Sequence, residues 1–506
     1  MKILCLGNNS YDTDNLVSLM AKEDNSTNHG LITDHSFIPV QPGYYHTTTV
    51  DIPVGTHVSL GKRFDKVILL DQPADQFTHW KILLTSYKIL KELEKQNVIT
   101  EYHNNENIKH IQYFENLVET NKSFCVYPFI LMQQENNKVT PCPKSNREIT
   151  KISAIKDWQK DELYNEIRNS MIKGEKVKGC EQCYFEESKN IVSTRQFETL
   201  DWISKLNVNT VKELQEYKQP KYYEVRLGNA CNMACRMCIP AYSSIIDKEF
   251  KELNIILPQG AYDKSIGYST TNHIDIESLD KKSRIYFTGG EPTVFNEFYE
   301  FMQKCIDAGK TDFDFCLGYN GQRLTDKMLS MFSHFSNMNF SFSIDGYGKI
   351  NDYIRSYSDW DTVIKNAKTL RAEGHTISME TIPSIYNANN LHLLLEFFDS
   401  EFPDSVQFLQ LEMQHPGRIL SAFGHPDSES CARSLERVQK TQRYLTDGRG
   451  GRSIIDAMYK HYVNKPQIDI NKLRLFYQFN DKLDKKRGTL LKDYLPELDA
   501  GRQFLK

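Results

Sequence analysis

The sequence has 506 residues, so at about 100 to 200 residues per domain it should form about three domains, each with its own core. Hydrophobic residues make up 40% and charged residues 25%, which excludes a disordered or collagen-like chain. Lys and Arg number 62 and Asp and Glu 66, a net charge of −4, so the overall charge favours neither nucleic acid nor an anionic membrane as a partner.

The N-terminus, from Met1 to Gly7, contains an apolar run that is too short for a signal peptide, and no stretch of about 18 apolar residues occurs elsewhere. The sequence therefore predicts a cytoplasmic protein without a membrane segment. Its 11 cysteines, an odd number in a long chain, favour reduced thiols kept for metal binding or catalysis over a disulfide framework.

Residues 1–115 are predicted to form a small α/β domain of unassigned role. Strands are expected at Lys2–Leu6 and Lys66–Leu70, and helices at Thr13–Lys22 and Lys81–Gln96. Nothing in this segment chooses among substrate classes.

Residues 120–200 contain four cysteines, and the last two form a Cys-x-x-Cys pair. The four are Cys125, Cys142, Cys180 and Cys183. Four thiolates satisfy a tetrahedral zinc ion, and they satisfy a 4Fe-4S cluster equally well. The residue types alone therefore leave both kinds of metal site open.

Residues 218–415 alternate between β-rich runs and segments with helical periodicity. The expected strands are Tyr222–Leu227, Arg284–Thr288, Asp312–Leu317, Asn339–Ile344, Thr376–Ile382 and Val406–Leu411. The expected helices include Phe295–Ala308, Asp326–Phe335, Trp360–Glu373 and Asn390–Phe397. Six such units predict an α/β fold, a partial (β/α)6 TIM-like barrel of parallel strands with reactive groups at the carboxyl ends.

Directly after the first of these strands, Cys231, Cys235 and Cys238 form a Cys-x-x-x-Cys-x-x-Cys triplet. Structural zinc normally takes four protein ligands, and no fourth cysteine or histidine lies close by in the sequence. An iron–sulfur cubane held by three cysteines leaves one iron open for a small molecule. The triplet therefore favours a catalytic cluster.

Residues 416–506 are predicted to form a helical C-terminal extension. Helices are expected at Ala432–Tyr444, Ile454–Tyr462 and Asn471–Leu483. The basic trio at residues 485–487, which follows the last of them, is interpreted as a solvated face rather than a nucleic-acid patch.

The cysteine triplet after a first strand resembles the signature of the radical S-adenosylmethionine (SAM) enzymes. The resemblance implies that Cys231, Cys235 and Cys238 hold a 4Fe-4S cluster and that SAM binds its open iron. Met237 stands where the family usually has an aromatic residue, a departure that weakens the expected stacking on adenine without removing a ligand.

The ends of later strands carry further matches to this family. The Gly-Gly-Glu-Pro tetrapeptide resembles the motif that receives the methionine amino group, and the Asn-Gly pair after the third strand resembles a family turn. A serine and an arginine after the fourth strand are implied to contact the ribose and the methionine carboxylate, which suits a guanidinium. Whether Asp345 fixes a turn or touches substrate, and whether Glu380 points into the barrel, stays open. The implied SAM contacts are Gly289, Gly290, Glu291, Pro292, Asn320, Ser343 and Arg355.

The segment with the other four cysteines, including Trp158, Arg168, Gly174 and Arg195, resembles the Twitch module, a shortened relative of SPASM, placed here before the barrel. The resemblance implies a second, auxiliary 4Fe-4S cluster that moves an electron. Residues 120–498 as a whole are similar to Twitch domain-containing radical SAM proteins of phages and marine bacteria.

The resemblance implies an oxidoreductase or modifying enzyme that draws one electron from reduced flavodoxin or ferredoxin. SAM would be cleaved to methionine and a 5′-deoxyadenosyl radical that removes hydrogen from an unreactive carbon. The expected substrate is a peptide or protein side chain, with a carbohydrate or nucleotide as the rival. The alternative from another class is a non-catalytic iron–sulfur or zinc-binding protein.

Overall fold

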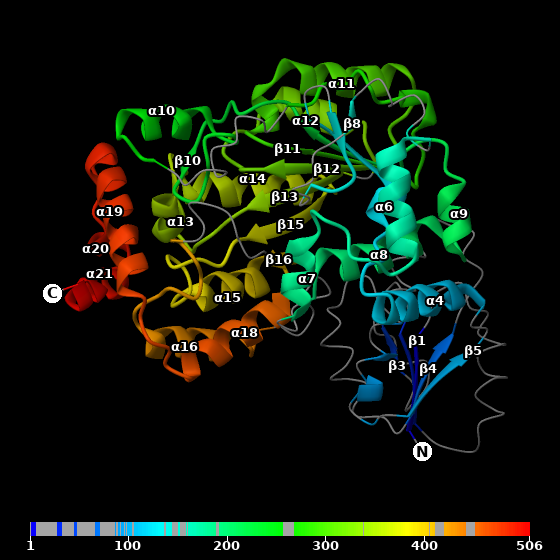
Figure 1. Ribbon diagram of the computed structural model, residues 1–506, viewed down its shortest axis with the longest axis horizontal. Coiled ribbons are helices and arrows are strands. Elements are labelled where there is room, and N and C mark those ends of the chain that lie inside the picture. The colour runs from blue at the N-terminus through cyan, green and yellow to red at the C-terminus, as the bar shows by residue number, and fades with distance from the viewer. Residues whose placement is uncertain are drawn as a thin grey trace.

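The computed structural model describes the barrel and the C-terminal helices almost throughout, and the N-terminal region in short segments (Figure 1). The described residues are 2–6, 28–32, 45–47, 66–70, 87, 90, 91, 93–95, 97, 99–103, 106–135, 138–143, 150, 151, 158, 160–188, 192–256, 268–336, 338–403, 405–409, 419–441 and 451–505.

One sheet of nine strands organises the protein. Its order is β16-β15-β13-β12-β11-β9-β6-β7-β8; the first seven pair in parallel, and β7 and β8 are antiparallel. The strands are β6 (Leu131–Glu135), β7 (Lys138–Thr140), β8 (Thr150–Lys151), β9 (Tyr222–Arg226), β11 (Arg284–Thr288), β12 (Asp314–Tyr319), β13 (Met338–Ser343), β15 (Thr376–Thr381) and β16 (Val406–Leu409). The mostly parallel sheet confirms the predicted α/β class and the six barrel strands.

Side chains of the central strands divide between two environments because successive residues of a strand point to opposite faces. On the outer face, apolar residues such as Phe287 and Phe315 are fully buried, and their rings stack with centroids 5.5 Å apart. On the inner face the same strands carry polar residues, among them Glu224 and Glu380, which line a cavity. The sheet therefore packs its apolar face under helices and keeps a polar concave face for chemistry.

The covering helices follow the strands as the periodicity predicts. They are α11 (Asn296–Asp307), α12 (Asp326–Phe332), α14 (Trp360–Ala372) and α15 (Leu391–Glu401). Side chains cap two of them: Thr325 accepts a hydrogen bond from the backbone at the start of α12, and Asp359 does so for α14.

The cysteine-rich segment folds as short helices that adjoin the edge of the same sheet. They are α4 (Glu106–Thr120), α5 (Tyr127–Ile130), α6 (Glu162–Ile172), α7 (Glu181–Ser188), α8 (Thr194–Leu206) and α9 (Val211–Gln215). Their apolar residues, including Phe124 and Trp202, form a separate hydrophobic cluster. Strand β6 pairs with β9, so this segment continues the barrel sheet, a pairing that the sequence analysis did not foresee.

The C-terminal region is helical, as predicted, and lies against the barrel (Figure 1). Its elements are α16 (Ser428–Val438), α18 (Gly451–Val463), α19 (Ile470–Arg487), α20 (Leu491–Tyr494), α21 (Pro496–Ala500) and the 3₁₀ turn η4 (Gly501–Leu505). Helix α19 ends at Gly488, whose φ of +65° supplies the left-handed cap that glycine adopts readily. None of the described helices is both long and apolar enough to cross a membrane.

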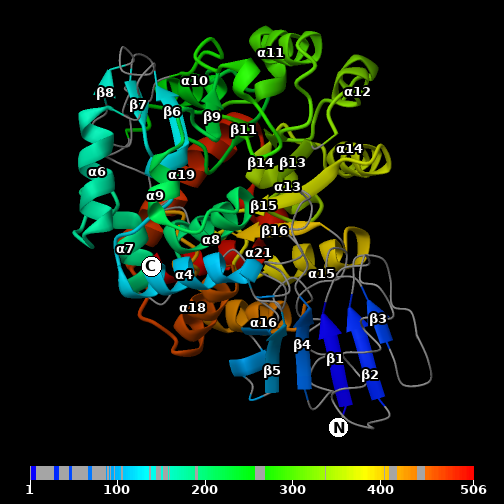
Figure 2. The same ribbon diagram turned by 90° about the vertical axis from the view of Figure 1, so that its right-hand side faces the viewer.

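A second sheet lies near the N-terminus, beneath α4 in both views (Figures 1 and 2). All its strands are parallel, in the order β3-β2-β1-β4-β5. They are β1 (Lys2–Leu6), β2 (Asn28–Ile32), β3 (Tyr45–Thr47), β4 (Lys66–Leu70) and β5 (Ile99–His103). The two predicted strands are confirmed; the predicted helix Thr13–Lys22 lies outside the described residues, as does part of Lys81–Gln96.

Candidate active site

The concave face of the nine-stranded sheet encloses a cavity of about 540 Å³. It is lined by alternate residues of six neighbouring strands, β9 to β16, and by Cys235 and Cys238 of the triplet. A cavity of this size with a few convergent polar groups is the usual form of a small-molecule site. Two of the three triplet cysteines therefore face this cavity.

The triplet lies on a loop that is tied to the barrel by backbone hydrogen bonds. Within it, β10 (Ala234–Cys235) pairs antiparallel with β14 (Arg355–Ser356), which sets Cys235 opposite Arg355. The loop then turns into α10 (Ser244–Glu252), whose first turn is capped by the Ser243 hydroxyl. The loop is thus held at both ends before any metal binds.

The three thiols lie close enough to influence one another. Burial, together with the nearby Cys235 thiol, raises the pKa of Cys231 to about 12. Burial also raises the pKa of Cys238 well above its usual range, with Cys235 and Cys231 adding to the shift. A bound cation stabilises the thiolate form, so three half-buried sulfurs that repel one another when charged fit an iron–sulfur cluster.

Arg355 brings positive charge to this group of sulfurs. Its Nη1 lies 3.7 Å from the Sγ of Cys235, and its Nε lies 2.6 Å from the Oδ2 of Asp345. Asp345 also accepts a hydrogen bond from the backbone of Ile382, so in this structure it fixes the turn and orients the arginine. Burial raises the pKa of Asp345, and Arg355 opposes that shift.

Ser343 and Glu380 lie on the neighbouring strands β13 and β15. Ser343 ends β13 in register with Glu380 and is half-buried. Glu380 lines the barrel cavity, which answers the question of its direction, and its Oε2 accepts a hydrogen bond from Ser341.

The glycine turn after β11 packs backbone against backbone on the start of the cysteine loop. The amide of Gly290 donates to the carbonyl of Gly228 at 3.0 Å, and that of Glu291 donates to Ala230 at 2.9 Å. Gly289 has a φ of +111°, a conformation that L side chains rarely adopt. A Cβ at Gly290 would overlap the carbonyl oxygen of Ala230, so only glycine permits this approach.

We expect Gly290→Ala to destabilise the protein by about 1–3 kcal/mol, because the loop beneath it must move aside. Urea unfolding checks the difference, and Gly424→Ala is a control, since a Cβ there would meet its nearest atom, the Ser421 carbonyl oxygen, at 3.3 Å. Equal stability of the two variants would contradict the assigned packing.

The carboxylate of Glu291 joins the ends of two strands. Its Oε2 accepts from the backbone of Asn320 at 2.9 Å, and its Oε1 accepts from the Thr293 hydroxyl at 2.7 Å. Burial raises its pKa to about 7, while these hydrogen bonds lower it. Asn320 in turn donates to Asn232 on the cysteine loop at 2.6 Å. The Gly-Gly-Glu-Pro tetrapeptide, the Asn-Gly turn and the cysteine loop are therefore connected by hydrogen bonds. The SAM contacts assigned to them remain predictions.

The other four cysteines converge on a second, mostly apolar pocket. Cys125, Cys142, Cys180 and Cys183 all line it, although they come from segments up to 58 residues apart. Burial raises the pKa of Cys125 well above its usual range, and the other three thiols add to that shift. Among the described residues, no group of three or more His, Cys, Asp or Glu side chains is arranged closely enough in this structure to hold a metal ion.

Two residues line both the second pocket and the barrel cavity. Tyr127 and Thr194 belong to each lining, so the two cavities adjoin. Burial raises the pKa of the Tyr127 phenol well above its usual range, and Glu198 in the barrel wall and Cys142 in the second pocket both contribute.

The residues that carried the resemblance to the auxiliary module support this pocket. Arg168 is buried, donates from Nε to the carbonyl of Pro128 at 2.8 Å and stacks on Trp158 with its guanidinium 4.7 Å from the ring centroid. Arg195 makes a two-pronged pair with Glu187, both contacts at 2.8 Å.

A buried group of charges near the amino ends of the barrel strands escaped the sequence analysis. Lys205 of α8 reaches Asp314 at 3.0 Å, and Arg284 reaches the same carboxylate at 2.7 Å. Burial lowers the pKa of Lys205 to about 8. Cys316 lines the barrel cavity beside this group.

We expect Asp314→Asn to lower the free energy of unfolding by about 3–5 kcal/mol, because it removes the negative charge that faces two buried cations. Urea unfolding measures the loss. Glu429→Gln is the matched control: it breaks an exposed pair with Arg433 that should contribute at most about 1 kcal/mol. A loss at Asp314 no larger than that of the control would contradict the buried arrangement.

Residues 225–409, from the end of β9 to β16, match the family model described as the radical SAM superfamily. This segment contains the triplet, the glycine turn and Arg355. This part of the chain therefore matches the radical SAM domain. The family implies a 4Fe-4S cluster and SAM, and supports SAM-dependent radical chemistry.

Solved structures that resemble the chain include native anSMEcpe with bound AdoMet, at 14% identity over 43% of this chain and 59% of that chain, with a TM-score of 0.30. SuiB of Streptococcus suis bound to S-adenosylmethionine has 14% identity over 66% of this chain and 65% of that one, with a TM-score of 0.28. TYW1 with a lysine-pyruvate adduct bound has 11% identity over 44% and 73%, with a TM-score of 0.25. The chain thus spans less than two thirds of the first two. No curated protein sequence matches it.

Proposed function

We propose that the protein binds a 4Fe-4S cluster through Cys231, Cys235 and Cys238 and cleaves SAM reductively in the barrel cavity. The observation that carries the proposal is the triplet itself: its three half-buried thiols lie on a loop beside a cavity within the segment that matches the radical SAM model, and two of them line that cavity. When bound, the cluster supplies the electron that converts SAM to methionine and a 5′-deoxyadenosyl radical.

The chain's own groups would bind and orient SAM. Gly289 lines the cavity beside the triplet and offers backbone atoms at close range, and Arg355 brings a guanidinium suited to a carboxylate. Asn320 and Ser343 stand at neighbouring strand ends and complete the proposed contacts with Gly290, Glu291 and Pro292. Enclosure by the sheet keeps water from the radical.

We also propose that Cys125, Cys142, Cys180 and Cys183 bind a second 4Fe-4S cluster. Four thiol ligands would cap all its irons, so its role would be to accept an electron from the substrate radical rather than to bind substrate. The wall that its pocket shares with the barrel cavity, at Tyr127 and Thr194, supports this role. Reduced flavodoxin or ferredoxin in the cytoplasm would supply the electron for SAM cleavage.

The proposed substrate is a peptide or protein side chain, and a carbohydrate or nucleotide is the rival class. The polar inner wall, with Glu224, Glu380 and Asn339, suits a substrate that offers several hydrogen-bonding groups. Incubation of the reduced enzyme and SAM with candidate substrates, followed by mass spectrometry, separates these classes by which one changes mass.

The first test is spectroscopic. Anaerobically reconstituted protein reduced with dithionite should show an electron paramagnetic resonance signal that changes when SAM is added, and 5′-deoxyadenosine should accumulate. About eight irons per chain and no zinc are expected. One or two zinc ions without iron would instead support a non-catalytic zinc-binding protein.

A further inference from the structure

The residue between Cys235 and Met237 is an arginine that points away from the cavity. Arg236 is fully buried, and its guanidinium lies 3.7 Å from the centroid of the Tyr353 ring. Its Nη2 lies 2.7 Å from the Oδ1 of Asp484 on α19, and its Nη1 donates to Asn480 on the same helix at 3.0 Å. The centre of the cysteine triplet is thus bonded to a helix 248 residues further along the chain.

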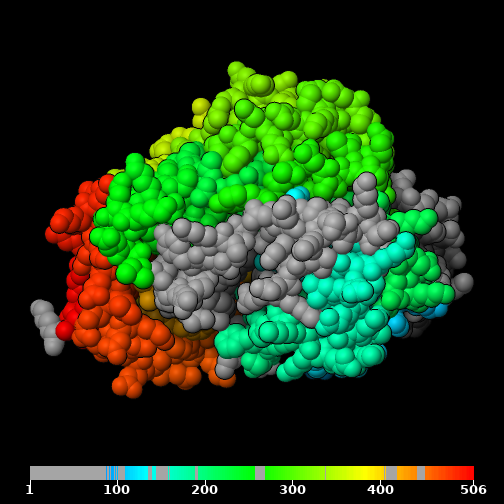
Figure 3. Space-filling model, turned by 45° about the horizontal axis from the view of Figure 1, so that its top comes forward, coloured from blue at the N-terminus to red at the C-terminus, as the bar shows by residue number. Residues whose placement is uncertain are grey.

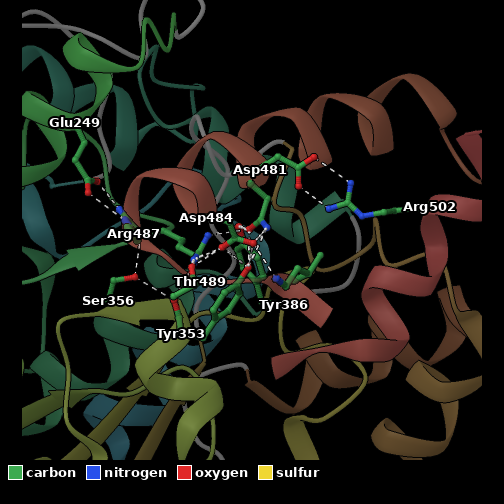
Figure 4. A network of polar contacts seen from close by, with 12 residues as sticks. Glu249, Tyr353, Ser356, Tyr386, Asp481, Asp484, Arg487, Thr489 and Arg502 are labelled. Carbon is green, nitrogen blue, oxygen red and sulfur yellow. Dashed lines mark hydrogen bonds and ion pairs between the residues drawn. The ribbon is translucent and has the colours of Figure 1, made fainter. Parts of the chain in front are cut away.

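The arginine uses nearly all its donors in this position. Nη2 also donates to the Thr489 hydroxyl at 3.0 Å, and Nε donates to the Tyr353 carbonyl at 2.8 Å. Asp484 is shared in turn by Tyr353, Thr489 and the backbone of Leu491. Figure 4 shows Asp484, Thr489, Tyr353 and Tyr386 gathered around one point. A planar guanidinium with fixed donors, stacked and bonded on every side, permits one orientation of the loop.

A second ion pair ties the same helix to the other end of the loop. Arg487, at the end of α19, pairs with Glu249 of α10 at 2.5 Å and donates to the Ser356 hydroxyl of β14 at 2.9 Å. Arg487 is 2% exposed and Glu249 4%, so the interpretation of the basic trio as a solvated face is wrong for this residue. Figure 3 shows the red C-terminal helices lying directly against the green segment that follows the triplet.

These contacts bracket the cysteine loop. Arg236 lies inside it, Ser356 belongs to the strand that pairs with Ala234 and Cys235, and Glu249 lies on the helix that the loop enters. The two arginines face two carboxylates, Asp484 and Glu249, so the buried charges balance.

We infer that helix α19 is the outer support of the cluster-binding loop, and that Arg236 and Asp484 are positioning residues for the cluster held by the triplet. This inference rests on the proposed function. The support sets the spacing of the three thiols, so weakening it lowers the occupancy of this cluster and its response to SAM. The C-terminal extension is then part of the catalytic unit and not an appendage.

The test compares Asp484→Asn with Asp481→Asn in the full-length reconstituted protein. Asp481 lies one turn earlier on α19 and pairs with Arg502 at the surface, its side chain 53% exposed. Asp484→Asn is expected to lose most of the SAM-induced change in the paramagnetic signal and the iron bound by the triplet, while Asp481→Asn matches the unmodified protein. An Asp484→Asn protein with normal iron and a normal response to SAM would overturn the inference.

Arg236→Lys decides the matter where Asp484→Asn does not fold, as judged by circular dichroism. Lysine keeps the charge but cannot reproduce the separate hydrogen bonds to Asp484, Asn480 and Tyr353 or the stacking on the Tyr353 ring. A folded Arg236→Lys protein with a weakened response to SAM supports the inference, and one with an unchanged response rejects it. If the unmodified protein itself ignores SAM, the proposed function fails instead, so the two failures are distinguishable.

Discussion

Replacing Cys235 by Ala is expected to abolish the formation of 5′-deoxyadenosine from SAM. The residue supplies one of three thiols around the proposed cluster, and its β10 backbone keeps the loop paired with β14, so the substitution removes a ligand without removing the strand pairing. A cubane with two protein ligands is not held firmly enough to present an open iron to SAM. Chromatography of the reaction products after dithionite reduction measures the loss.

Cys305→Ala is the control for this substitution. Cys305 is fully buried on α11, in the hydrophobic core outside the barrel cavity, and belongs to neither cysteine group. It should cleave SAM at the rate of the unmodified protein. Persistent cleavage by Cys235→Ala would refute the three-thiol cluster as the site of the chemistry.

The double substitution Cys180→Ala with Cys183→Ala is expected to halve the bound iron, from about eight to about four per chain, and to leave SAM cleavage in place. The reason is positional. These cysteines line a separate pocket that shares only a wall with the barrel cavity, and the triplet lies on another loop. Turnover of the true substrate should stop, because the electron left on it has no acceptor.

Iron and sulfide analysis, paired with the 5′-deoxyadenosine assay, checks this second result. Cys431→Ala, a fully buried thiol on α16 that belongs to neither group, serves as its control. If the double variant loses zinc and keeps all its iron, the second pocket is a structural zinc site. If it loses SAM cleavage together with half its iron, the two clusters are not independent.

Much of the fold was predictable because its signals are local. Runs of β-branched and aromatic residues predict the barrel strands, and the observed bounds of β11, Arg284–Thr288, match the prediction residue for residue. The triplet and the Cys-x-x-Cys pair are equally local, so spacing alone identified five of the seven metal-ligating candidates. The structure adds that the four cysteines of the second group share one pocket.

What escaped prediction depends on contacts between distant segments. Strand β6 belongs to the barrel sheet only because it pairs with β9, about 90 residues away in the sequence. In the sequence, Arg236 and Arg487 cannot be told apart from surface arginines, because their partners come close only when α19 packs against the cysteine loop. Lys205 likewise pairs with Asp314 across the barrel wall. No local sequence pattern marks such pairs of distant residues. The interpretation of Arg487 as solvated was wrong for that reason.

The pairing of β6 with β9 also determines whether the barrel can be separated from the cysteine-rich segment by truncation. Without residues 120–217, the backbone amides and carbonyls along one side of β9 lose their partners. An exposed strand edge of this kind can pair with the same edge of another molecule and cause aggregation. The cysteine-rich segment therefore covers the β9 edge of the barrel sheet and also contains four of the proposed cluster ligands.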